Sequence, residues 1–369
     1  MKSNWPTKKL GEVCEIMSPG IKEFEGSKKY VATADVDFDK IVNFTEITYK
    51  NRPSRANIEV RENDILVARM AETKKFLIAD KNLQDNYIFS TGFAVMRVKE
   101  ELTPRYLFYF LTTKDFNLQK DKLAVGATQK AINNPALKKI KIPLPPLPIQ
   151  QKIVERIEEL FEKIDKAKEL RQKAQEETET IFPSALQEIF DKAEKKWGTK
   201  KLGEIIELHY GKGIPQKDRK VDGKYPIYGA NGELGRTDKY FVEGEAIIIG
   251  RKGTAGAVNR VSGRFWPADV TYYVFGNEKI DIDFLFYTFK KIDLSQLATG
   301  IKPGINRNKV YELQIPLPPL SEQKKIVDYL DSLREKVGKL KQLQQKQLEE
   351  LNELKNSILD KAFKGELVG

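Results

Sequence analysis

The feature that most constrains this chain is an ordered internal repeat. The octapeptide Trp5-Pro-Thr-Lys-Lys-Leu-Gly-Glu recurs as Trp197-Gly-Thr-Lys-Lys-Leu-Gly-Glu, and the hexapeptide that starts at Ile142 recurs at Ile315, 173 positions later. The same offset aligns Gln150 with Gln323. An ordered series of matches is typical of a duplicated unit rather than of chance. The repeat therefore predicts two variable globular blocks, each followed by a proline-containing hinge and a similar tail.

Both tails predict long helices that pack together. Apolar residues recur in alternating steps of four and three, which is the pattern of a coiled-coil contact. The predicted contact residues are Ile153, Ile157, Leu160 and Ile164 in the first tail, and Ile326, Leu330, Leu333, Val337, Leu340, Leu351 and Leu354 in the second. Because the first helix leads into the second block and the second helix leaves it, we expect the two to run antiparallel. Two independent amphipathic helices are the alternative.

Polar residues interrupt this contact at Arg171, Gln344 and Gln347, where such residues usually fix register and partner. Pro183 lies inside the first helix and is expected to kink or restart its last turns. We expect the two blocks at opposite ends of the resulting rod, since each helix of about 40 residues is roughly 60 Å long.

The predicted fold class is α+β, with two tandem globular domains separated by two long helices that form an antiparallel coiled coil. Short β-rich runs separated by glycine-containing turns dominate the blocks, and one helix is expected in each block, near Pro104 and near Asp283. The predicted boundaries are 1–145 and 196–318 for the two globular domains, and 146–195 and 319–369 for the two helices.

The charge balance favours a polyanionic partner for the globular blocks. The chain has a net charge of +11 at pH 7. Residues 149–196 hold ten Lys and Arg against twelve Asp and Glu, and residues 321–369 hold ten against nine. The tails therefore carry −1 and the blocks +12. This distribution argues against a basic coiled coil that binds DNA by itself and favours DNA binding by the blocks.

Several functional classes are excluded by what the chain lacks. A single cysteine, Cys14, and a single histidine, His209, leave no disulfide framework, cysteine cluster or multi-histidine metal site. The chain contains neither a P-loop nor the Asn/Asp-Pro-Pro-Tyr/Phe tetrapeptide of amino-methyltransferases, so we expect no catalytic residues, no metal and no cofactor in this chain. Without a membrane-spanning run or a signal-peptide core, a cytoplasmic location is expected.

Candidate DNA contacts lie in loops of both blocks. Arginine pairs with guanine edges and asparagine with adenine, whereas lysine and threonine commonly contact phosphates. The residues predicted to bind DNA are Arg69, Lys130, Asn133, Arg236, Arg251, Lys252, Thr254, Lys302, Asn306 and Arg307. For any one of them, a solvated surface charge is the alternative.

Taken together, these motifs resemble the specificity subunit of type I restriction–modification systems. The resemblance rests on two blocks that each end in Ile-Pro-Leu-Pro-Pro-Leu followed by Gln-x-Lys-Ile-Val and a long helix, and on the Trp-x-Thr-Lys-Lys-Leu-Gly-Glu that precedes each block. It covers essentially the whole chain. The loops 126–133 and 300–306, with Arg69 and Arg251, match family positions near DNA. The first block departs from the second because it lacks Gly-Thr-x-Gly after its arginine.

The resemblance implies a function without catalysis. Each block would read half of a bipartite double-stranded DNA target, and the helices would set the spacer. Two methyltransferase subunits and the motor–nuclease restriction subunits would be the partners, and they would use S-adenosylmethionine, ATP and Mg²⁺. A DNA-binding adaptor or repressor outside restriction is the second hypothesis, and an interaction scaffold that does not bind DNA is the third.

Overall fold

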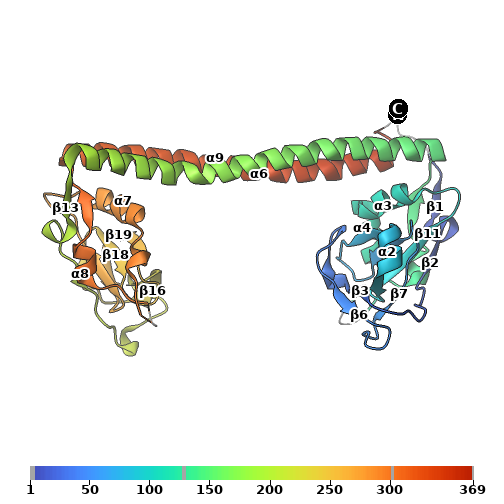
Figure 1. Ribbon diagram of the computed structural model, residues 1–369, viewed down its shortest axis with the longest axis horizontal. Coiled ribbons are helices and arrows are strands. Elements are labelled where there is room, and N and C mark those ends of the chain that lie inside the picture. Colours follow the sequence, from blue (N-terminus) through green and yellow to red (C-terminus); the bar gives the residue numbers. More distant parts are fainter. Residues whose placement is uncertain (1–4, 127–129, 301–302, 368–369) are drawn as a thin grey trace. The chain divides into compact units, whose positions relative to one another are not determined.

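The computed structural model describes residues 5–126, 130–300 and 303–367. The chain divides into two compact units (Figure 1). The first unit contains Met1–Arg171 and Lys346–Gly369, and the second contains Gln172–Gln345. Each unit therefore combines one globular domain with parts of both long helices, α6 (Leu147–Trp197) and α9 (Leu320–Lys364).

The first domain is built from three main antiparallel or mixed sheets. A two-stranded sheet pairs β1 with β12, and two four-stranded sheets have the orders β2-β11-β8-β9 and β6-β3-β10-β7. The strands are β1 (Thr7–Lys9), β2 (Cys14–Met17), β3 (Lys28–Val31), β4 (Val36–Asp37), β5 (Lys40–Ile41), β6 (Thr45–Ile47), β7 (Ala56–Ile58), β8 (Ile65–Ala68), β9 (Phe76–Ile78), β10 (Tyr87–Ser90), β11 (Phe93–Val98) and β12 (Lys141–Pro143). Strands β4 and β5 form a separate small pair.

The second domain repeats this topology. The sheets β13-β22, β14-β21-β18-β19 and β16-β15-β20-β17 correspond in order to the three of the first domain, and each domain has one parallel strand pair, β3 with β10 and β15 with β20. Its strands are β13 (Thr199–Lys201), β14 (His209–Tyr210), β15 (Tyr225–Gly229), β16 (Gly232–Thr237), β17 (Val242–Glu243), β18 (Ala246–Gly250), β19 (Val258–Val261), β20 (Arg264–Pro267), β21 (Thr271–Val274) and β22 (Gln314–Pro316). The internal repeat of the sequence therefore corresponds to two domains with the same sheet topology.

Helices cover one sheet of each domain and begin where the sequence provides a cap. In α3 (Pro104–Thr112), the Thr103 hydroxyl accepts from the Tyr106 amide, and in α7 (Ile282–Ile292) the Asp281 carboxylate accepts from the Phe284 amide. The expectation of one helix per domain is too simple. The remaining helices are α1 (Leu10–Val13), α2 (Lys81–Asn86), α4 (Lys114–Leu123), α5 (Asn134–Leu137) and α8 (Arg307–Tyr311).

The long helices pack against each other in antiparallel fashion within each unit. Three contacts of the first unit show this direction: Asp165 pairs with Lys355, Lys168 donates to Asn352 and Arg171 donates to Gln347. As the residue number increases along α6, the number of its partner in α9 decreases. In the second unit, Glu179 pairs with Lys341 and Thr178 contacts Gln344, which is the same antiparallel order. The predicted antiparallel pairing is therefore confirmed.

Most residues of the predicted four–three contact are buried or half-buried, and two are exposed. The buried members of the predicted contact are Ile153, Ile157, Ile164, Leu330 and Val337. Leu160, Ile326, Leu333 and Leu351 are half-buried. By contrast, Leu340 and Leu354 are 39% and 46% exposed and lie at the edge of the contact. An α-helix of 3.6 residues per turn drifts by about 20° per heptad from a 3.5-residue repeat, which moves such positions off the contact line.

Pro183 does not restart the first helix. The helix α6 continues through Pro183 to Trp197 as one element. Pro183 and Glu179, whose carbonyl loses its usual partner there, are both exposed. Water can solvate a carbonyl that is freed on the outer face, so the missing amide is tolerated.

A buried polar layer crosses the helix pair of the second unit. The Gln344 side-chain amide donates to the Thr178 hydroxyl at 3.0 Å and to the Ala174 carbonyl at 3.2 Å, while its Oε1 atom is buried and has no hydrogen-bond partner. An unpaired buried acceptor is costly, and polar layers of this kind fix register rather than increase stability. Gln344 is therefore a residue whose replacement should stabilise the protein.

We expect Gln344→Leu to raise the free energy of unfolding by about 1 kcal/mol, because it removes the unpaired oxygen while Thr178 keeps its bond to Ala174. Urea denaturation followed by circular dichroism measures the change. Gln342→Leu, at an exposed position of the same helix, is the control and should have little effect. A loss of 1 kcal/mol or more in Gln344→Leu would show that the polar layer contributes net stability.

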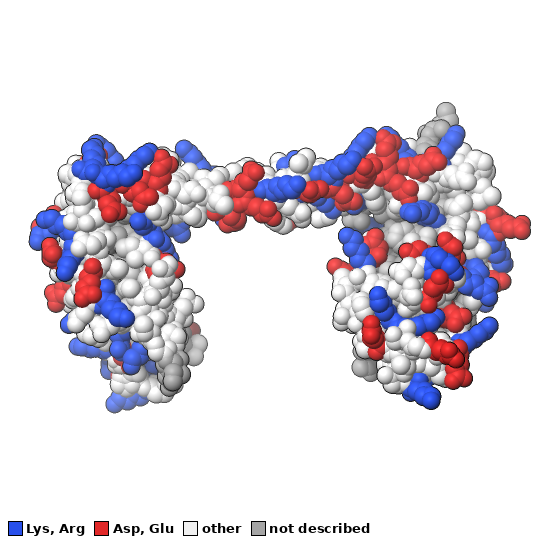
Figure 2. Space-filling model, viewed as in Figure 1, with Lys and Arg blue, Asp and Glu red and all other residues white. Residues whose placement is uncertain are grey.

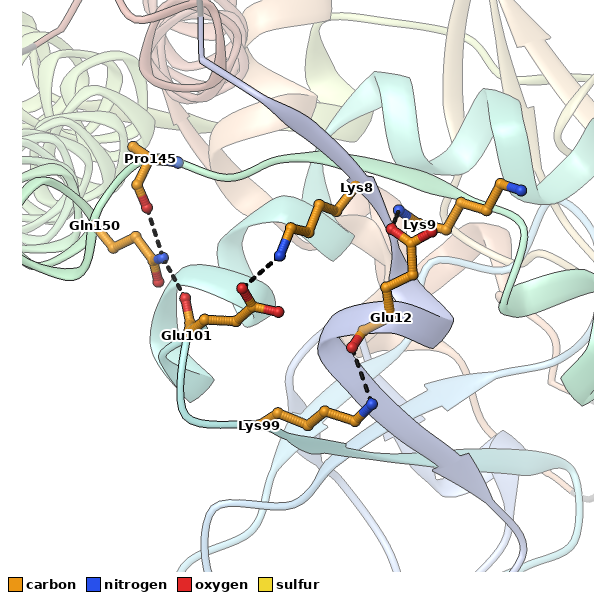
Figure 3. Close-up of polar contacts among 7 residues, drawn as sticks. All are labelled: Lys8, Lys9, Glu12, Lys99, Glu101, Pro145 and Gln150. Carbon is orange, nitrogen blue, oxygen red and sulfur yellow. Dashed lines mark hydrogen bonds and ion pairs between the residues drawn. The ribbon is translucent and has the colours of Figure 1, made fainter.

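In each domain, a buried glutamine side chain at the start of the long helix forms hydrogen bonds to the backbone of the domain. The Gln150 side chain accepts from the Thr103 amide and donates to the carbonyls of Glu101 and Pro145, each at 2.9 Å. Figure 3 shows the amide of Gln150 between the two carbonyls. Gln150 is fully buried and all three of its hydrogen-bonding contacts are to the backbone.

The second domain contains the same arrangement at Gln323. Its side chain accepts from the Asp281 amide at 2.8 Å and donates to the carbonyls of Lys279 and Pro318 at 2.9 and 2.8 Å. Gln323 is also fully buried. We refer to Gln150 and Gln323 as the glutamine clamps.

Candidate nucleic-acid interface

In each domain an arginine ends a buried central strand and meets the loop that precedes the hinge. Arg69 follows β8, and its carbonyl accepts from the Ile132 amide at 2.9 Å. Arg251 follows β18, and its carbonyl accepts from the Ile305 amide at 3.0 Å. In each domain the structure therefore places the arginine against the described end of the predicted loop, residues 130–133 in the first domain and 303–306 in the second.

The two arginines have different surroundings. The Arg69 guanidinium donates to the carbonyls of Phe93 and Ile132 at 3.1 and 3.3 Å, and to Ser18 Oγ and Asn134 Oδ1 at 2.8 and 2.7 Å. Burial lowers the pKa of Arg69, because the charged form loses solvation. With four acceptors of its own chain, this side chain holds the loop in place and has few donors left for DNA.

Arg251 is less occupied. Its Nη2 atom donates to the Asp269 carbonyl at 2.8 Å, and its guanidinium carbon lies 5.7 Å from the centre of the Tyr210 ring. Arg307, the first residue of α8, lies 5.2 Å from the centre of the same ring. The second domain thus gathers two cations around one exposed tyrosine.

The predicted asparagines cap short helices. Asn133 Oδ1 accepts from the Ala136 amide at 2.9 Å at the start of α5, and Asn306 Oδ1 accepts from the Asn308 amide at 2.8 Å at the start of α8. Both residues are exposed. Their capping role explains the recurrence of this residue in both domains.

Three further residues of the predicted loops have exposed side chains. Lys130, Lys252 and Thr254 are exposed, and the backbone of Lys252 pairs with Gly304. A Cβ atom at Gly250 would lie 2.3 Å from the Thr254 carbonyl oxygen, so the glycine permits a close approach of the two backbone segments. Lys302 lies outside the described residues.

Arg236 is bound within its own hairpin. It donates to the carbonyls of Gly223 and Lys224 at 2.7 and 3.1 Å, and it pairs with Glu233 at 3.0 Å. These contacts hold the end of the loop between β14 and β15 against β16, and the contact of Arg236 with DNA stays a prediction.

Sequence reasoning missed the residues that fix the first domain's loop. Lys120, a fully buried lysine in α4, donates to the Thr73 carbonyl, and Asp121 accepts from the Glu72 amide at 3.0 Å. Burial lowers the pKa of Lys120. These contacts hold the segment 70–75, which takes the place of the second domain's Gly-Thr-x-Gly segment. A lysine in an amphipathic helix gives no signal that it is buried.

The charge on the surface differs between the two domains in the view of Figure 2. Lys and Arg alternate with Asp and Glu over the first domain and along the helices, whereas the end of the second domain remote from its helices shows mainly Lys and Arg. The loop between β14 and β15 contributes Lys212, Lys217, Arg219, Lys220 and Lys224 to the second domain. Of these, Lys220 pairs with Asp238.

Two other classes of site receive no support in the ranges described. Residues 5–126, 130–300 and 303–367 contain no group of three or more His, Cys, Asp or Glu side chains that could hold a metal ion. Over the same ranges, no helix has the length and apolar character needed to cross a membrane.

Comparison with known proteins agrees with this architecture. The type I restriction modification DNA specificity domain matches twice, at residues 2–176 and 194–351. The MjaVIII specificity subunit of Methanocaldococcus jannaschii, a type I restriction enzyme subunit, is 29% identical over 99% of this chain and 93% of its own length. S.HindORF215P of Haemophilus influenzae, described as a type I restriction enzyme specificity subunit, is 30% identical over 40% of either chain.

Similarity to a solved structure extends over the whole chain. A chain from a study of complex assembly and conformational transition of the type I R-M system superposes with a TM-score of 0.81, covers 98% of both chains and is 26% identical. The family is one of specificity subunits, whose catalytic partners are separate subunits. The duplicated fold, the paired long helices and both family matches lead to one conclusion: this chain belongs to the type I restriction–modification DNA specificity family.

Proposed function

We propose that each domain reads one half of a bipartite DNA target. The observation that carries this proposal is the repetition of one topology, with an arginine at the end of the central strand and a loop held against it in both domains. Two similar surfaces with different side chains suit two half-sites of different sequence. The paired helices would then determine the number of base pairs between the half-sites.

We further propose that the chain recruits two methyltransferase subunits and the restriction subunits. S-Adenosylmethionine, ATP and Mg²⁺ would be bound by those partners, and this chain would contribute sequence recognition. The near-neutral helices and the glutamine clamps support a scaffold role, since the clamps tie each recognition domain to the helix pair of its unit through backbone atoms.

Exchange of one domain tests the proposal. Residues 196–315 are replaced by the corresponding block of a relative, and methylated adenines are sequenced in DNA from cells that also express the methyltransferase. One half of the methylated target should change while the other half stays the same. The unmodified chain and the reciprocal exchange of the first domain are the controls. A change in both halves, or in neither, would contradict separate reading by the two domains.

A further inference from the structure

The two domains differ in charge at one corresponding position. The 173-residue offset places Asn134 opposite Arg307. In the first domain, the Asn134 side chain accepts from Arg69 and neutral partners surround the guanidinium. In the second domain the corresponding residue is a second arginine, so Arg251 has no such acceptor, and a second positive charge lies over the same Tyr210 ring.

This cation pair is left without compensation inside the domain. The contacts described for the side chains of Arg251 and Arg307 are to aromatic rings and to one carbonyl, and no described carboxylate forms an ion pair with either. The Nε atoms of both are buried without a hydrogen-bond partner. Two cations around one ring repel each other, and an anion bound at either would be attracted by both.

The same contacts indicate which anion fits. A side-on bidentate contact with a guanine edge needs Nε together with an Nη atom, but both Nε atoms are shielded from solvent. The Nη2 atom of Arg251 already donates to the Asp269 carbonyl. The Nη atoms that remain can still meet a base edge end-on, but two positive charges at one site favour the charged oxygens of a phosphate over the neutral edge of a base.

We propose that Arg251 and Arg307, arranged around Tyr210, form a phosphate-binding site in the second domain, and that the first domain has an uncharged acceptor at the equivalent position. The site holds a phosphate of the DNA backbone and positions the second domain on its half-site without reading sequence. The identification of the phosphate as part of DNA rests on the proposed function, whereas the anion site itself does not.

The test replaces Arg307 by the residue that the first domain has at this position. Binding of the full chain to a 40-base-pair duplex of random sequence is measured between 50 and 200 mM salt. Arg307→Asn should lower affinity about five- to tenfold at low salt and reduce the slope of log affinity against log salt by about 1. Arg307→Lys keeps the charge and should keep most of the slope. Lys279→Gln removes an exposed charge beside the Gln323 clamp and should change neither.

A second measurement separates the site from the function. Thermal unfolding is followed with inorganic phosphate and with sodium chloride at equal ionic strength. Phosphate should raise the midpoint of the wild-type chain and of Lys279→Gln by about 1–2 °C near the dissociation constant, and that of Arg307→Asn by less. Equal phosphate shifts in all chains would overturn the anion site. A phosphate shift with an unchanged DNA salt slope would overturn its contact with DNA. A wild-type chain that binds phosphate but no duplex would keep the anion site and contradict the proposed function.

Discussion

Replacement of Gln150 by leucine is expected to lower the stability of the first unit by about 3 kcal/mol. The change leaves the Thr103 amide and the carbonyls of Glu101 and Pro145 without their buried partner. Each unsatisfied buried group costs about 1–3 kcal/mol, and partial relaxation keeps the total below the sum. Gln323→Leu should have the same effect on the second unit, because its three contacts are equivalent.

Chemical denaturation gives the loss of stability, and amide hydrogen exchange gives its location. The Thr103 amide should exchange faster in Gln150→Leu, and the Asp281 amide should exchange faster in Gln323→Leu. Gln151→Leu is the matched control, since Gln151 is the exposed neighbour in the same helix. If Gln150→Leu and Gln151→Leu differ by less than 1 kcal/mol, the clamp does not fasten the domain.

Shortening both long helices together is expected to change the spacing of the methylated target. The contacts of the first unit define opposite segments, because Asp165 meets Lys355 and Lys168 meets Asn352. Deletion of 164–170 together with 349–355 removes these partners as pairs and keeps the contact between Arg171 and Gln347. Seven residues correspond to about 10 Å of helix and preserve the coiled-coil phase.

A loss of about 10 Å corresponds to about three base pairs of duplex at 3.4 Å each. Both half-sites should be kept and the spacer should become about three base pairs shorter. Three base pairs also rotate one half-site by about a third of a turn, so the rate of methylation should fall. Sequencing of methylated adenines measures both effects. Deletion of 164–170 alone puts the helices out of register and should abolish activity. Full-rate methylation at the original spacing by the paired deletion would mean that helix length does not set the gap.

The sequence predicts the large-scale fold because that fold is repeated. One copy of the motif at Trp5 or Ile142 would be uninformative, but two copies at a constant order mark domains and hinges. The long helices follow from apolar periodicity over many turns. The sheets do not, because their strands have between two and six residues and pair across loops, and short apolar runs give no register.

The individual binding residues are harder to predict for a similar reason. Arg69 and Arg251 look alike in the sequence, since each ends a buried strand. Their difference depends on partners far along the chain, because Ser18 and Asn134 lie 51 and 65 positions from Arg69. The offset of 173 residues, which pairs Asn134 with Arg307, is the one sequence signal that could have revealed it.

The glutamine clamps also bear on how such a protein can change over generations. Every hydrogen-bond partner described for the side chains of Gln150 and Gln323 is a main-chain atom of the domain turn or the hinge. Because these partners are main-chain atoms, the hydrogen bonds can form with many different side chains in the surrounding turn, provided that the turn keeps its shape. A recognition domain could therefore be rewritten or exchanged wholesale and still fit its helix. In this way the protein can acquire new target sequences while the glutamine clamps between domain and helix stay unchanged.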